Sequence, residues 1–211
     1  MCGIFAFKGK SLSKEELNKS FQKIQYRGPD QSEFMQIDDL FTMGFHRLAI
    51  MDLTDAGMQP FIFNDTQALM CNGEIYNYEE IKDYFNLYAY KSSSDCEALV
   101  PLIKKIGFEK SLELIEGEFA IIYYDVSTAT VKAARDPMGI RPLFYGYTKY
   151  SKEIAFASEA KALIDICDIV KPFPPGQYFD GKNFHTFKTY DKDYSPYLAD
   201  EKRSERINRE S

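Results

Sequence analysis

The sequence of 211 residues contains no tryptophan, only two histidines and only four cysteines. The cysteines are scattered, and no two of them have CxxC spacing; they are Cys2, Cys71, Cys96 and Cys167. A zinc site needs a cluster of cysteine and histidine ligands, so no metal site is expected. In a reducing compartment the four side chains should be free thiols.

The sequence also lacks a basic excess and a long apolar run. Lys and Arg number 26 against 32 Asp and Glu, so the formal net charge is −6, and a nucleic-acid partner is not expected. No apolar stretch approaches the roughly 20 residues of a membrane helix. The N-terminus has neither the basic start nor the apolar length of a signal peptide. These absences predict a cytoplasmic protein with no membrane partner.

Phosphate-binding glycine loops are missing as well. Residues 27–30 and 135–143 are rich in Arg, Asp, Gly and Pro, but neither segment matches a Walker A loop or a GxGxxG fingerprint. Each segment taken alone is explained by a hydrogen-bonded turn. No nucleotide cofactor is therefore expected to bind this chain.

The residues that are abundant predict a folded α+β domain. Seventeen Phe and 15 Tyr supply a large core, and these residue types favour strands. Apolar segments pair as three hairpins, at 119–126 with 131–135, 143–147 with 154–157, and 177–180 with 184–187. Helical patterns gather in two early blocks without regular βαβ alternation, which favours antiparallel sheets covered by helices.

Local signals place the first elements. Residues 4–7 predict a buried strand, and Ser13 with Glu16 forms a capping box that opens a helix through about Gln25. Residues 67–71 predict a short strand that stops at a tight turn at Asn72-Gly73.

Three further helices are predicted after that strand. Asn77 is expected to cap a helix over 78–86, and Ser94 a helix from Asp95 to about Ile106, with Pro101 kinking or breaking it. A short helix is expected at 159–164. From residue 191 the chain is polar and has too little apolar content to fold alone.

Cys2 is the sharpest chemical feature. If the initiator methionine is removed, Cys2 becomes the first residue, and its α-amine has a reference pKa of about 8. That amine can act as a general base for the adjacent thiol, so such a nucleophile needs no histidine. The alternative is a buried cysteine at the start of the first strand.

Three other features have side chains that can bind a ligand, and each also has an ordinary structural explanation. Asn72-Gly73 offers two donors suited to an oxyanion hole, although it is equally an ordinary turn. Arg47, at the end of an apolar strand, can grip a carboxylate or be a salt-bridged edge residue. Asp95 can receive an ammonium group or stabilise a helix start.

Taken together and in order, eight strings resemble the glutaminase domain of class II glutamine amidotransferases, in particular that of glutamine-hydrolysing asparagine synthetases. The strings span residues 1 to about 180. They are MCGIF (1–5), RGPD (27–30), HRLAIMD (46–52), NGEIYN (72–77), SDCE (94–97), GEFA (117–120), RD with Gly139 and PL (135–143), and SEAKAL (158–163).

The resemblance implies an N-terminal nucleophile hydrolase fold, a four-layer αββα sandwich of two antiparallel sheets. It also implies hydrolysis of L-glutamine to glutamate and ammonia, with Cys2 as nucleophile and its freed amine as base. The Asn72 amide and the Gly73 N–H would hold the oxyanion. Arg47 would bind the α-carboxylate of glutamine, and Asp95 and Glu74 its α-ammonium. The pocket would also be lined by the backbone of Leu48, Ala49, Ile50 and Met51.

The sequence departs from the family in two ways. Phe45-His46-Arg47 and Tyr26-Arg27 stand where members often carry a second basic residue and a histidine, so the loop packing is expected to differ. Asparagine synthetases also continue into an ATP-using domain. We therefore expect a glutaminase domain over residues 2–190. Residues 191–211 would be a polar tail or the start of a linker to an absent synthetase domain, where ATP and Mg²⁺ would bind.

Three functions are compatible with these residues. The first is a glutaminase that supplies ammonia for asparagine synthesis by a synthetase domain or subunit. The second is the same chemistry for another acceptor, a sugar phosphate or phosphoribosyl pyrophosphate. The third is a catalytically silent glutamine-binding module. Homodimerisation is left open by the sequence.

Overall fold

The structure, a computed structural model, describes residues 1–64, 66–86 and 91–189. Its framework is two six-stranded sheets in which every neighbouring pair of strands is antiparallel. The first sheet, in spatial order, is β10 (Ile169–Pro172), β8 (Phe144–Tyr147), β9 (Ile154–Ala157), β1 (Gly3–Lys8), β3 (Phe41–Arg47) and β2 (Gln31–Asp38). The second is β12 (Phe184–Thr186), β11 (Gln177–Phe179), β7 (Thr130–Arg135), β6 (Gly117–Asp125), β5 (Gln67–Ile75) and β4 (Phe61–Phe63).

Alternation along the strands builds the layers. In β1, Ile4 and Ala6 join the core between the two sheets, whereas Phe5 and Phe7 face the opposite side. In β5, Met70 enters the core between the sheets and Leu69 enters the outer cluster. Side chains alternate between the two faces of a strand, and β1 and β5 each contribute buried apolar residues to both faces of their sheets.

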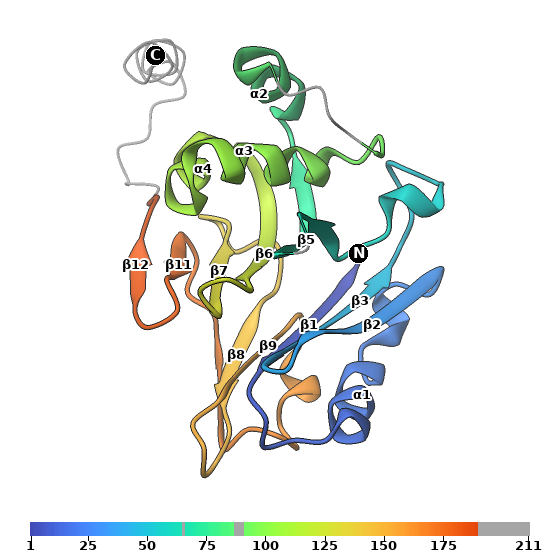
Figure 1. The fold of residues 1–211 in the computed structure, drawn as a ribbon, viewed down its shortest axis with the longest axis vertical. Coiled ribbons are helices and arrows are strands. Elements are labelled where there is room, and N and C mark those ends of the chain that lie inside the picture. The colour runs from blue at the N-terminus through green and yellow to red at the C-terminus, as the bar shows by residue number, and fades with distance from the viewer. Residues whose placement is uncertain (65, 87–90, 190–211) are drawn as a thin grey trace.

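Helices cover the two outer faces (Figure 1). α1 (Lys14–Gln22) packs Leu17 and Phe21 against the outer face of the first sheet. α2 (Tyr78–Phe85), α3 (Leu99–Ile106) and α4 (Phe108–Leu114) cover the outer face of the second. The result is the four-layer αββα sandwich that was predicted.

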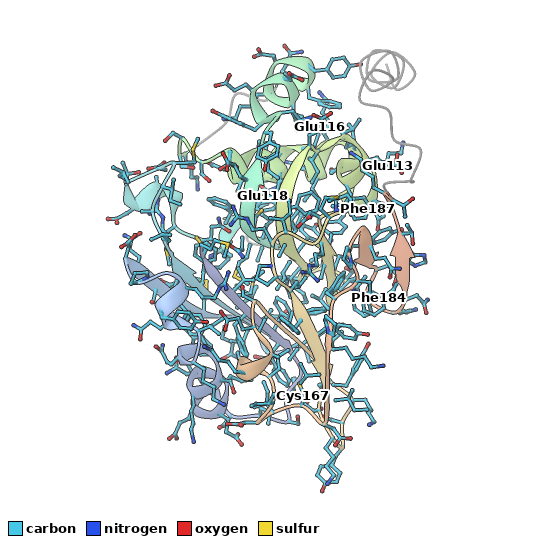
Figure 2. The ribbon with its side chains drawn as sticks, turned by 180° about the vertical axis from the view of Figure 1, so that it is seen from behind. Glu113, Glu116, Glu118, Cys167, Phe184 and Phe187 are labelled. Atoms are coloured by element: carbon cyan, nitrogen blue, oxygen red, sulfur yellow. The ribbon has the colours of Figure 1, made fainter. Side chains whose placement is uncertain are left out.

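The aromatic residues near the C-terminal end of the described chain close the far side of the sandwich. Phe184 on β12 packs against Phe173 and Tyr145, with ring centroids 5.1 and 4.9 Å apart respectively. Phe187 stacks on Phe119 of β6 at 6.2 Å. Figure 2 shows both phenylalanines from behind. These ring contacts join β12, at the edge of the second sheet opposite β4, to β8 of the first sheet.

Most local predictions are confirmed. The three hairpins form, the four cysteines are free thiols, and Ser13 and Glu16 make both bonds of a capping box. α1 ends at Gln22, before a 3-10 turn over Gln25–Arg27. The segment predicted as helix at 159–164 contains only a 3-10 turn, Ala160–Ala162.

The prediction of a tight turn at Asn72-Gly73 is wrong. β5 continues through both residues to Ile75, because β6 pairs with it along its whole length, Asn72 opposite Ala120 and Gly73 opposite Phe119. Nine backbone positions in one ladder outweigh the local turn preference of the dipeptide.

Two helix predictions are also corrected. The segment beginning at Asp95 starts as a 3-10 turn and becomes α3 at Leu99, so Pro101 lies in the first helical turn, where its missing N–H has no intrahelical partner to lose. Asn77 precedes α2, but its side chain bonds the Leu114 carbonyl and the Glu116 N–H and does not cap the helix. α4, β4 and β10 were not predicted.

No helix in the described ranges has the length and apolar character needed to cross a bilayer. The predicted polar tail at 191–211 lies outside the described residues.

Candidate active site

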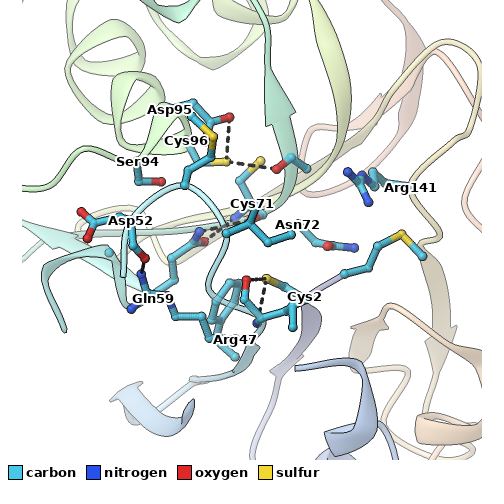
Figure 3. A pocket seen from close by; sticks show the side chains of 17 residues that line it. Cys2, Arg47, Asp52, Gln59, Cys71, Asn72, Ser94, Asp95, Cys96 and Arg141 are labelled. Carbon is cyan, nitrogen blue, oxygen red and sulfur yellow. Dashed lines mark hydrogen bonds between the residues drawn. The ribbon is translucent and has the colours of Figure 1, made fainter. Parts of the chain in front are cut away.

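One pocket lies where the start of β1, the end of β3 and the middle of β5 meet (Figure 3). Its lining contains the predicted residues Cys2, Arg47, Leu48, Ile50, Met51, Asn72, Gly73 and Asp95. It also contains Met1, Phe45, Asp52, Gly57, Gln59, Cys71, Ser94, Cys96 and Arg141. The fold thus brings together segments separated by up to 140 positions in the chain.

The Cys2 thiol lies directly before the first residue of β1 and is held by the backbone of Leu48. Its Sγ accepts a hydrogen bond from the Leu48 N–H at 3.4 Å and contacts the Leu48 carbonyl oxygen at 3.7 Å. The Cys2 carbonyl accepts from Arg27 Nε at 3.0 Å, which gives the RGPD turn a positioning role. Burial raises the pKa of the Cys2 thiol above its usual value. The thiol therefore needs a base to become a nucleophile near neutral pH.

The terminal amine lies beside that thiol. In the full sequence it belongs to Met1, which lines the same pocket, and its pKa is lowered chiefly by burial. An amine with a lowered pKa is unprotonated over more of the neutral range and can accept a proton. Removal of Met1 would place the amine on Cys2 itself.

Asn72 carries a donor with no partner. The residue is 1% exposed, and its Nδ2 is a buried atom without a hydrogen bond in the described structure. An unpaired buried donor costs about 1–3 kcal/mol, so proteins keep one where a ligand satisfies it. The Asn72 amide lines the pocket that also contains the Cys2 thiol.

The Gly73 N–H points away from β6, toward the side of β5 that faces the pocket. The Phe119 carbonyl, opposite Gly73, bonds the Asp136 N–H, so the backbone of Phe119 faces β7 and that of Gly73 faces away from β6. On the other side of β5, β4 pairs only with residues 67–69. A Cβ on Gly73 would lie 2.2 Å from the Glu118 carbonyl oxygen, so only glycine fits here.

Arg47 is a buried cation without an acidic partner. It is 4% exposed, and its guanidinium donates to Gln31 Oε1 and the Thr54 carbonyl, both at 2.6 Å, and to the Asp52 carbonyl. None of the ion pairs in the described part of the chain includes it. A buried charge held only by neutral groups favours an anionic ligand.

Asp95 is the matching buried anion. It is 4% exposed, and its Oδ2 accepts from the Ile75 N–H at 2.6 Å. It likewise forms no ion pair among the residues that the structure describes. The pocket lining therefore contains the Arg47 cation and the Asp95 anion, and neither belongs to an ion pair among the described residues.

Two predicted site residues lie outside the lining. The Ala49 N–H donates to Asp30 at 2.8 Å, and Glu74 is exposed. Their proposed contacts with glutamine remain predictions.

Sequence reasoning did not single out Asp52, Gln59 or Arg141. Asp52 joins two loops of the rim through Thr54 and the Ser93 N–H, and these hydrogen bonds lower its pKa to about 2. Gln59 bonds the backbone of β5, and Arg141 pairs with Glu118 at 2.5 Å. Asp52 stands in a recognised string, but the partners of all three are set by tertiary structure.

Known proteins share this sequence and this fold. The family model described as "Glutamine amidotransferase domain" matches residues 1–186. A probable glutamine-hydrolysing asparagine synthetase of Acanthamoeba polyphaga mimivirus is 41% identical over 184 residues, covering 84% of this chain and 33% of that protein. Asparagine synthetase 1 of Saccharomyces cerevisiae is 35% identical, covering 96% of this chain and 35% of its own length.

Among solved structures, the allosteric regulatory enzyme of purine biosynthesis superposes with a TM-score of 0.74 at 22% identity. It covers 90% of this chain and 50% of its own. Glutamine phosphoribosylpyrophosphate amidotransferase from B. subtilis gives 0.73 at 21% over the same shares. These likenesses show the fold alone.

The chain spans about a third of the length of the curated relatives it matches. Its first 186 residues match the family model, and its sequence identity to two synthetases exceeds one third. The chain therefore belongs to the glutamine amidotransferase family, in the class II group that has the N-terminal nucleophile hydrolase fold.

Proposed function

We propose that this chain is a glutaminase that hydrolyses L-glutamine to glutamate and ammonia, with Cys2 as the nucleophile. The observation that carries the proposal is the set of unsatisfied groups in one pocket. Among the described residues, Arg47 has no anionic partner, Asp95 has no cationic partner, and Asn72 Nδ2 has no acceptor. Glutamine supplies a carboxylate, an ammonium and an amide oxygen.

Binding would place the side-chain amide of glutamine against Cys2. Arg47 would hold the α-carboxylate and Asp95 the α-ammonium, with Leu48, Ile50 and Met51 around the carbon chain. A ligand lacking either charge would leave one of these buried groups unpaired, which is costly, so selection for a free amino acid follows.

Catalysis would proceed in two steps. The Cys2 amine takes the thiol proton, and Sγ attacks the amide carbon, whose oxygen becomes an oxyanion held by Asn72 Nδ2 and the Gly73 N–H. The protonated amine then gives its proton to the departing nitrogen, and ammonia leaves a thioester. Water attacks the thioester, which releases glutamate and restores the thiol. No metal or cofactor takes part in these steps.

The ammonia acceptor is proposed from the relatives. Proteins 34–41% identical to this chain are named as glutamine-hydrolysing asparagine synthetases. We propose that the ammonia is used for asparagine synthesis in the cytoplasm by a synthetase domain or subunit, which would bind ATP and Mg²⁺. Recovery of a sugar-phosphate or phosphoribosyl enzyme as the bound partner would contradict this assignment.

The test of the hydrolysis is a pair of cysteine variants. Cys2→Ala should form no glutamate from glutamine, whereas Cys167→Ala should keep wild-type turnover. Cys167 is a matched control because it is a buried thiol that packs on the outer face of the first sheet, outside the pocket lining (labelled in Figure 2). Turnover retained in Cys2→Ala, or a wild-type chain that binds glutamine without turnover, would refute the proposal.

A further inference from the structure

The pocket side of β5 is an open sheet edge that side chains complete. Beyond Leu69, β5 has β6 on one side and, among the described strands, no neighbour on the other. Residues 71, 73 and 75 turn their backbone groups toward this open side. An unpaired edge of this kind is usually satisfied or covered.

The Gln59 side chain lies opposite Cys71, where a longer β4 would have continued its pairing with β5. Its Oε1 accepts from the Cys71 N–H at 2.7 Å, and its Nε2 donates to the Cys71 carbonyl at 3.2 Å (Figure 3). A primary amide offers one acceptor and one donor in the geometry of a peptide group. Gln59 is 5% exposed and lines the pocket.

Two more side chains continue the edge. The Cys96 thiol lies 3.6 Å from the Gly73 carbonyl, and Asp95 accepts from the Ile75 N–H at 2.6 Å. Between these contacts only the Gly73 N–H keeps its direction into the pocket without a strand or side-chain partner among the described contacts. From the Cys71 N–H to the Ile75 N–H, side chains therefore contact the described backbone groups of the open edge except the proposed oxyanion donor.

We infer that Gln59 is a positioning residue for the oxyanion hole, holding Cys71 so that Asn72 Nδ2 and the Gly73 N–H converge on the reacting amide. This inference rests on the proposed glutaminase function. Gln59 acts through the adjacent backbone and belongs to the segment that leads into β4, so it sets where β5 lies without binding the α-groups of glutamine.

The first test is Gln59→Met, which keeps the length of the side chain and removes both hydrogen bonds. Loss of one oxyanion donor lowers kcat by about 100- to 1000-fold. A donor that is displaced but still present should lower kcat by less than its complete loss would. We therefore expect kcat for glutamate formation to fall about 10- to 100-fold, with KM for glutamine within about threefold of the wild-type value. Gln67→Met is the same substitution at the first residue of β5, outside the pocket lining, and should leave kcat unchanged.

The second test uses Gln59→Glu and its pH profile. An ionised carboxylate accepts from the Cys71 N–H but faces the Cys71 carbonyl with no donor, whereas the protonated acid regains a donor. Burial raises a carboxyl pKa, so the protonated form grows as the pH falls. The ratio of variant to wild-type kcat should therefore rise with decreasing pH. This variant also answers the question if Gln59→Met does not fold.

The outcomes separate the two proposals. Wild-type kcat in Gln59→Met, or a raised KM at unchanged kcat, would overturn the positioning role while leaving the glutaminase function intact. A pH-independent ratio for Gln59→Glu would also overturn it. A wild-type chain that forms no glutamate would overturn the glutaminase function and, with it, the role of Gln59.

Discussion

β1 and β5 each bring one half of the proposed chemistry to the pocket, and they are held in different ways. β1 is a central strand, paired with β3 on one side and β9 on the other, and the Cys2 nucleophile stands at its start. β5 beyond Leu69 has a strand on one side and side chains on the other. The nucleophile therefore depends on a fully paired strand, whereas the oxyanion donors depend on an edge with one N–H left open.

The start of β1 also differs from β5, because the proposed catalytic amine there forms only after Met1 is removed. The proposed base appears on Cys2 only when nothing precedes it, whereas Asn72 and Gly73 are in place within the folded chain. The two halves should accordingly fail in different ways, one by loss of a covalent processing step and the other by loss of geometry.

The largest effect is expected from blocking the terminus. A fusion ahead of Cys2 with a protease site that leaves Cys2 as first residue should be inactive before cleavage and active after it, because only cleavage frees the amine. Glutamate formation measured on one preparation before and after cleavage checks this, and the same fusion at the C-terminus serves as the control. Equal activity before and after cleavage would rule out the amine as base.

The next effect is expected from Asn72→Ala. Loss of one oxyanion donor should lower kcat about 100- to 1000-fold, or about 3–4 kcal/mol, with little change in KM. Because Nδ2 has no hydrogen-bond partner in the described part of the chain, the free energy of unfolding should hardly fall. Steady-state kinetics and urea unfolding measure the two quantities.

Asn77→Ala is the control for Asn72→Ala, and it should affect stability without affecting activity. Its side chain makes two hydrogen bonds to the backbone ahead of β6, so its loss should cost about 1–2 kcal/mol of stability and leave kcat in place. If both asparagine variants lost stability and activity together, the division between a structural and a catalytic amide would be wrong.

Gly73→Ala should act on the fold as well as the chemistry. The added Cβ would lie 2.2 Å from the Glu118 carbonyl oxygen, so β5 and β6 must separate. Overpacking of this kind costs about 1–3 kcal/mol, and the same movement displaces the open N–H. Thermal unfolding and kcat should both fall, and an unchanged melting temperature would show that the strands are farther apart than described.

The smallest effect is expected at Asp52, on the rim. Its hydrogen bonds from Thr54 and Ser93 lower its folded pKa to about 2, below the unfolded value of about 3.9. This contribution to stability is complete above about pH 4 and is lost as the pH falls toward 2. The difference in melting temperature between wild type and Asp52→Asn should therefore shrink from pH 5 to pH 3. A constant difference would contradict the shift.

The sequence was informative about features that the residue types and their order along the chain determine. Apolar segments separated by short connections predicted the three hairpins, and the resemblance pointed to Cys2, Arg47, Asn72, Gly73 and Asp95, which the fold gathers in one pocket. Burial and the lack of ion-pair partners for Arg47 and Asp95 were not readable from the sequence, because both depend on the final packing.

The sequence was misleading where pairing decides the structure. Asn72-Gly73 has the composition of a turn, and only β6 opposite makes it a strand. Gln59 gave no signal, since nothing in its neighbourhood of the chain shows that its amide meets Cys71. Pro101 suggested a kink or break in the helix. The structure avoids it because α3 begins at Leu99, so that Pro101 lies in the first turn of the helix.

The most direct test of the central claim is an intact mass spectrum after incubation with a diazo-ketone analogue of glutamine, followed by peptide mapping. The proposed site predicts loss of Met1 and a single adduct on Cys2, with no adduct in Arg47→Ala, which cannot hold the carboxylate of the analogue. Retention of Met1 with no adduct, or an adduct on another cysteine, would contradict a glutaminase site built on an N-terminal Cys2.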